Sequence, residues 1–255
     1  MEKYLIAEMT WPELQEVARK KKMVIIPFGS HENNGPHLPL SLDSVVAYEI
    51  ALRLARAVEI PVAPLIPWGN SYQFARYPGT IIIRCEILGE LLKDILRSLG
   101  KHGFQKFLLL TPHVGNIWPA NMAGEELRKE GLFAVTVDWW RLQNRICADL
   151  GETKTLPSGH ASELATSLLL ALRPDLVRLD QITREVPTDP FYVKYSSASP
   201  AVYLYHDAKQ LSASGLFGDP SRATKEKGEE IMKRCLPYLV ELCLDFQKAE
   251  FRLED

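Results

Sequence analysis

Several features that mark particular classes of protein are missing from this sequence. The four cysteines, at 85, 147, 235 and 243, are scattered and form no Cys-x-x-Cys pair. This argues against a zinc ribbon and against a disulfide framework, so we expect reduced, mostly buried thiols. No Gly-x-Gly-x-x-Gly follows the first expected strand. The phosphate-binding glycines of a dinucleotide-dependent enzyme are therefore absent as well.

An excess of positive charge and a long apolar run are also missing. Lys and Arg number 30 against 32 acidic residues, giving a net charge of -2 with no basic cluster, so nucleic acid is not an expected partner. No window approaches about 18 uninterrupted apolar residues, and the start of the chain carries Glu2, Lys3 and Glu8. We therefore expect a cytoplasmic protein without membrane association, folded as a single domain over residues 1–255.

Short apolar runs alternate with stretches of helical spacing along the chain. The expected strands are 23–27, 62–66, 106–110 and 133–137, and the expected helices are 43–58, 86–99, 122–130, 161–172 and 224–251. This alternation predicts an α/β three-layer sandwich, in which helices cover both faces of a mostly parallel central sheet. In such sheets, ligands bind beyond the carboxyl ends of the strands. The stretch 178–214 lacks periodicity and is expected to form a long ordered loop that covers the site or a subunit contact.

Potential metal ligands gather where the expected strands end. The loop 29–43 after the first strand contains Glu32 and Asp43, and His113 follows the third strand. His160 and Glu163 stand before a later helix. Imidazole and carboxylate groups together suit Zn, Mn or Fe, and an open coordination position would hold the water that becomes the nucleophile.

Each of these residues also has an ordinary structural interpretation. Asp43 opens a helix, where a carboxylate commonly serves as a cap or a solvated charge. His160 and Glu163 are three residues apart, which suits joint metal binding and equally suits a surface pair. Spacing alone therefore leaves the metal site as one interpretation among several.

Five segments of the chain, taken in order, resemble motifs of the creatininase (creatinine amidohydrolase) family. Their order and spacing together are highly specific, and they run through most of the chain. The segments are Gly29-Ser30-His31-Glu32-Asn33-Asn34-Gly35-Pro36-His37-Leu38-Pro39-Leu40-Ser41-Leu42-Asp43, Gly69-Asn70-Ser71 with Tyr77-Pro78-Gly79-Thr80-Ile81, Lys101-His102-Gly103-Phe104 leading to His113-Val114-Gly115-Asn116, His160-Ala161-Ser162-Glu163 with Thr166-Ser167, and Gly215-Leu216-Phe217-Gly218-Asp219-Pro220.

The resemblance implies an amidohydrolase with a two-metal centre, often assembled as a hexamer from dimers. Glu32 and His113 would bind one metal, and Asp43 would bridge toward a second. The metal-activated water would attack a polarised carbonyl and cleave the C–N bond of a small cyclic or linear amide. His160 would donate a proton to the leaving nitrogen, and Glu163 is a candidate ligand or base.

Two further residues are candidates for substrate binding. Trp139 or Trp140, after the fourth expected strand, could line the substrate pocket. At least one of the two is expected to lie in the hydrophobic core instead. We select Trp139, together with Asn34, as substrate-binding residues. The expected partners are a small-molecule substrate and further copies of the same chain.

The sequence departs from the family pattern at polar positions. Asn34 stands where the family has its second-site histidine, and an amide is a poorer ligand than imidazole for a borderline-soft metal. Ala165 replaces a glutamate, and Gln73-Phe74 replace the usual Glu-His. These changes argue against creatinine as the substrate. The expected cofactor is Zn or Mn, with either one or two ions per chain. Formamide hydrolysis, ring opening and a non-catalytic, metabolite-binding role remain as alternatives.

Overall fold

The computed structural model describes residues 4–153, 158–196, 204 and 206–251. Within them, three parallel strands form one sheet in the order β1-β2-β3. The strands are β1 (Met23–Pro27), β2 (Lys106–Thr111) and β3 (Phe133–Asp138). Ile25 lies opposite Leu108 in the register, and Leu108 lies opposite Val135. The predicted α/β fold with a parallel central sheet is confirmed.

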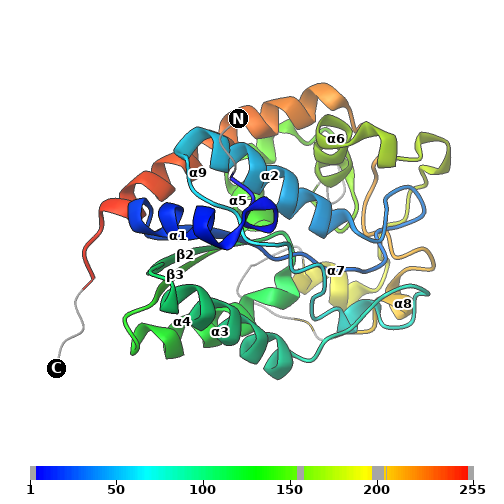
Figure 1. Cartoon of the computed structure of the whole chain (residues 1–255). Helices are drawn as coiled ribbons and strands as arrows, with labels where there is room; N and C mark the ends of the chain where they lie inside the picture. Colours follow the sequence, from blue (N-terminus) through cyan, green and yellow to red (C-terminus); the bar gives the residue numbers. More distant parts are fainter. Residues whose placement is uncertain (1–3, 154–157, 197–203, 205, 252–255) are drawn as a thin grey trace.

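Helices cover both faces of this sheet (Figure 1). One face packs against α2 (Leu42–Val58), α5 (Trp139–Cys147), α6 (Glu163–Leu172) and α9 (Lys225–Lys248). The other packs against α1 (Trp11–Lys20), α3 (Cys85–Lys101) and α4 (Ile117–Arg128).

The alternation of side chains along β1 explains the two helical layers. Met23 and Ile25 belong to the core on the α2 side, whereas Val24 and Ile26 belong to the core on the α3 side. All four are buried, because successive strand residues point to opposite faces and both faces are covered. An uninterrupted apolar run is the expected pattern for such a strand.

The prediction of a regular strand at 62–66 is wrong. This segment runs beside β1 and makes only isolated bridges, Ile25 with Val62 and Phe28 with Ile66. Prolines at 61, 64 and 67 lack the amide N–H that a continuous ladder requires, which explains the interruption.

The stretch 178–214 contains more regular structure than the sequence indicates. It includes the short helices α7 (Pro190–Ser196) and α8 (Ala208–Leu211), and part of it lies outside the described residues. The helix α5 was also not predicted.

The cysteines are free, and those at 147, 235 and 243 are buried, as expected. None of the helices among the described residues is long and apolar enough to cross a membrane.

Candidate metal centre

Three predicted ligands meet at the carboxyl edge of the sheet. Glu32 lies in the loop after β1, Asp43 lies in the first turn of α2, and His113 follows β2. One ligand atom from each lies within 4.8 Å of the other two, and all three side chains are buried. In the part of the chain that the structure describes, this is the one such group of three or more His, Cys, Asp or Glu residues.

The orientation of His113 is fixed by the backbone of a neighbouring loop. Its Nε2 lies 2.9 Å from the carbonyl oxygen of Asn70. A carbonyl can only accept, so Nε2 carries the hydrogen and the lone pair of the neutral ring is on Nδ1. Nδ1 lies 3.2 Å from Asp43 Oδ2 and 3.5 Å from Glu32 Oε1. The ring therefore presents its ligating atom to the two carboxylates, an arrangement typical of metal-binding histidines.

Two glycines allow this close approach of the loop to the imidazole. A Cβ atom at Gly69 would lie 2.7 Å from Asn116 Oδ1 and 2.8 Å from His113 Cδ2. A Cβ atom at Gly115 would collide with the Asn70 carbonyl and lie 2.7 Å from His113 Nε2. Both positions require the absence of a side chain for the Asn70 carbonyl to reach the ring.

The Asp43 carboxylate is held by two donors from different elements. The Ser30 hydroxyl donates to Oδ2 at 2.8 Å. The Trp140 indole N–H donates to Oδ1 at 3.3 Å, from the first turn of α5. Segments that follow all three strands thus contribute to one site.

The charges of the group do not balance without a further cation or proton. Glu32 Oε2 is buried and has no hydrogen-bond partner. Burial by itself would lower the pKa of His113, but the charges of Glu32 and Asp43 outweigh it and raise that pKa well above the usual value. Burial would raise the pKa of Glu32, and His113 overcomes this effect and lowers it. Two buried carboxylates facing one imidazole fit a divalent cation, because an unpaired buried charge is costly.

His160 lies beside this group on the Glu32 side. Its Nε2 donates to the carbonyl oxygen of Asn33 at 2.7 Å, since that oxygen has no hydrogen to give. Its Nδ1 lies 4.0 Å from Glu32 Oε1, and its ring stacks on Phe74 with 4.1 Å between centroids. Nδ1 is therefore the atom of His160 that can take up or release a proton near the centre.

Glu163, predicted as a catalytic residue, has a different environment. Its side chain is fully buried, and its Oε1 accepts from Lys227 Nζ at 2.6 Å. Its Oε2 accepts from the backbone N–H of Thr153 at 2.8 Å and from the Thr153 hydroxyl at 2.7 Å, and the Glu152 amide contacts both oxygens. These contacts favour a role in anchoring the 152–153 loop, and catalysis by Glu163 stays a prediction.

The two predicted substrate-binding residues are both buried. The Asn34 side-chain amide donates to the carbonyl of Glu32 at 3.1 Å. The Trp139 ring is fully buried in the core on the α2 side of the sheet. Substrate binding by these two residues stays a prediction, and of the two tryptophans it is Trp140 that reaches the centre.

Several contributors to the centre were not singled out from the sequence. They are the Ser30 hydroxyl, the Asn70 carbonyl and the Phe74 ring. Ser30 and Asn70 lie inside the motif segments, and this position was the one sequence signal that could have indicated them. A backbone carbonyl has no sequence signature of its own, and the stacking of Phe74 on His160 depends on tertiary contacts.

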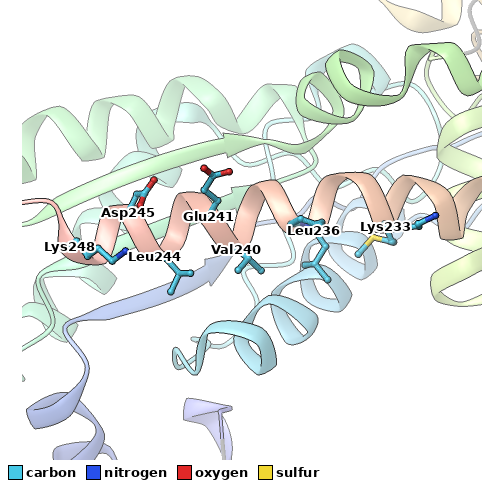
Figure 2. Close-up of a pocket in the computed structure, with 9 residues that line it drawn as sticks. Lys233, Leu236, Val240, Glu241, Leu244, Asp245 and Lys248 are labelled. Carbon is cyan, nitrogen blue, oxygen red and sulfur yellow. The ribbon is translucent and has the colours of Figure 1, made fainter.

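A groove of about 630 Å³ lies elsewhere, along α9. Figure 2 shows that its labelled side chains, from Lys233 to Lys248, come from that one helix. Its walls contain no histidine and none of the residues of the metal centre. The chemistry of the site is thus not located in this groove.

Comparison with known proteins decides the family. The family model described as creatinine amidohydrolase (creatininase) matches residues 7–243. The chain belongs to the creatininase family. This confirms the resemblance seen in the motifs, and the members of the family to which this hydrolase is similar are enzymes.

Curated relatives differ in the reactions that their names describe. Creatinine amidohydrolase of Pseudomonas putida is 28% identical over 252 residues, covering 91% of this chain and 92% of that protein. Mycofactocin precursor peptide peptidase of Mycobacterium tuberculosis is 31% identical, covering 82% and 79%. The 3-dehydro-scyllo-inosose hydrolase of Thermotoga maritima is 25% identical, covering 94% and 82%.

Solved structures agree with the fold. A creatininase structure described with Mn is 25% identical, has a TM-score of 0.78 and covers 96% of this chain and 98% of that chain. A protein from Bacteroides fragilis described as a putative creatinine amidohydrolase is 22% identical, with a TM-score of 0.82 and coverage of 99% and 100%.

Proposed function

We propose that this protein is a metal-dependent amidohydrolase that cleaves a C–N amide bond in a small polar substrate. The observation that carries the proposal is the buried group of Glu32, Asp43 and His113, with Glu32 Oε2 lacking a partner. Zn, Mn or Fe suits this set of one imidazole and two carboxylates. A bound cation of this kind supplies a more acidic water and polarises a carbonyl oxygen.

The residues around the centre would have separate roles in positioning the ligands and in proton transfer. Asn70 and Ser30 hold the imidazole of His113 and the carboxylate of Asp43 in place through the contacts at 2.9 and 2.8 Å. Glu32 offers its unpartnered Oε2 as an acceptor inside the buried site. His160 holds or moves a proton at Nδ1, which faces the centre, and would give it to the leaving nitrogen.

The relatives support hydrolysis and leave the substrate open. The names creatinine amidohydrolase and peptide peptidase both describe cleavage of a C–N bond, whereas the inosose hydrolase acts on a different class of compound. A cyclic amide, a formamide and a short peptide are therefore the substrate classes to test first. The polar departures at Asn34 and Ala165 argue against creatinine itself.

The test is amine release from those three classes of amide. Protein stripped with a chelator should be inactive, and addition of Zn²⁺, Mn²⁺ or Fe²⁺ should restore hydrolysis of at least one class. The matched control is Glu32→Gln, which keeps the shape of the side chain and removes its charge. Hydrolysis that survives the chelator, or metal-loaded protein that releases no amine from any class, would contradict the proposal.

A further inference from the structure

We propose that the centre holds a single cation, and that Trp140 is the positioning residue that holds Asp43 in place beside it. This inference rests on the proposed metal site and goes beyond it, because the resemblance implies two metals with Asp43 as the bridge. Trp140 takes no part in the reaction itself. It acts through Asp43.

The two oxygens of Asp43 face different surroundings. Oδ2 lies on the side of the cation ligands, 3.2 Å from His113 Nδ1. Oδ1 accepts the indole N–H of Trp140 at 3.3 Å. Oδ2 also accepts the Ser30 hydroxyl at 2.8 Å. One donor on each oxygen fixes the orientation of the carboxylate beside His113, as the hydrogen-bond partners of ligating carboxylates commonly do.

Ligands for a second cation are also lacking among the described residues. The amide nitrogen of Asn34 is directed at the carbonyl of Glu32. Asp138, at the end of β3, caps α5 through Oδ1, which accepts from the backbone N–H of Arg141 at 3.2 Å. Its Oδ2 has no hydrogen-bond partner and forms an ion pair with Arg141 Nε at 3.2 Å. Glu163 is engaged with Lys227. Within the described chain, no further carboxylate or imidazole lies within 4.8 Å of all three ligand atoms. His160 Nδ1 lies 4.0 Å from Glu32 Oε1 alone.

The placement of Trp140 follows from the start of α5. Adjacent residues of an α-helix point about 100° apart, so Trp139 and Trp140 face different directions. Trp139 is fully buried in the core and anchors the first turn of the helix against the sheet. With that ring in the core, the next residue is directed at Asp43. The order of the two tryptophans therefore determines which of them contacts the centre.

The first experiment counts Mn²⁺ ions on the chelator-stripped wild-type protein. Elemental analysis after gel filtration gives the ratio, and electron paramagnetic resonance shows whether the bound ions are isolated or coupled. We expect one ion per chain with the spectrum of an isolated Mn²⁺. Two ions per chain with a coupled spectrum would overturn this inference and leave the proposed function standing. No bound ion would overturn both.

The second experiment tests the positioning role. Trp140→Phe keeps an aromatic ring and removes the N–H donor, so the Kd for Mn²⁺ should rise by about 10- to 100-fold, the usual effect of losing such a partner. Trp11→Phe is the matched control, because it makes the same substitution at an exposed tryptophan at the start of α1. It should leave the Kd unchanged. A folded Trp140→Phe variant with the same Kd for Mn²⁺ as the wild-type protein would overturn the role of Trp140. If that variant does not fold, the ion count on the wild-type protein still decides the stoichiometry.

Discussion

Two buried glutamates in this protein, Glu32 and Glu163, are almost equally inaccessible, yet their surroundings differ. Glu163 has both oxygens occupied by Lys227 and by the 152–153 loop. Glu32 has one oxygen without any partner and faces a second carboxylate across an imidazole. Burial alone therefore does not mark a functional carboxylate. An incomplete set of partners beside further ligand groups is the better indication, because that arrangement is costly unless a bound cation completes it.

Substitutions beside Glu32 should affect chemistry and leave the fold intact. Substitutions beside Glu163 should affect stability and leave metal binding intact.

The largest expected effect is on catalysis at His160. His160→Gln can still donate to the Asn33 carbonyl, but it cannot carry a proton at the position of Nδ1. The value of kcat should fall by about 100-fold or more, the usual contribution of a general acid or base. Metal content should not change. Steady-state kinetics on the substrate found by the amide panel measure this, and an unchanged kcat would remove His160 from the mechanism.

The next effect is on stability at Glu163. Glu163→Gln removes the buried partner of Lys227, which keeps the exposed carboxylate of Glu152 at 2.8 Å. The change should cost about 2 kcal/mol, the usual contribution of a hydrogen bond to a charged group. Urea denaturation measures the loss, with Mn²⁺ affinity measured on the same sample. A folded variant that loses metal instead of stability would place Glu163 among the metal ligands after all.

A further effect concerns pH and His37. This side chain is buried, with Nε2 2.9 Å from the Thr166 hydroxyl, and burial lowers its pKa from 6.5 to about 4. The unfolded chain takes up a proton below about pH 6.5, and the folded protein does not do so until about pH 4. Folding stability should therefore decrease as the pH falls through that interval, by up to about 3 kcal/mol.

His37→Gln provides the control for this pH effect. Denaturation in the presence of a chelator at the two ends of the interval separates the contribution of His37 from loss of metal. The variant should show a smaller decrease than the wild-type protein. An equal decrease in both would assign the pH effect to other groups.

The sequence was sufficient to predict the sheet and the three metal-ligand candidates. The strands at 23–27 and 106–110 are buried on both faces, and this produces the apolar runs that made them recognisable. The strand at 133–137 lies at the edge of the sheet and is mostly half-buried, but it has a similar apolar run. Glu32 and His113 follow such strands, and Asp43 opens the helix after β1, so the parallel topology brings them together.

The sequence was not sufficient where tertiary contacts decide. The strand at 62–66 looked regular because its apolar residues are buried, whereas its prolines interrupt the pairing. Spacing suited His160 and Glu163 equally well as a metal-binding pair or a surface pair. The burial of Glu163 could not be predicted, because its partner Lys227 lies 64 residues further along the chain. Single-domain organisation over 1–255 and assembly with further copies of the chain stay predictions.

The most direct test of the account is the metal content of the wild-type protein compared with Glu32→Gln. Both are purified without chelator or affinity metal, and folding is checked by circular dichroism. The account predicts one transition-metal ion per wild-type chain and almost none in a folded Glu32→Gln variant. Equal metal content in the two folded proteins would contradict the assignment of this group as the metal centre.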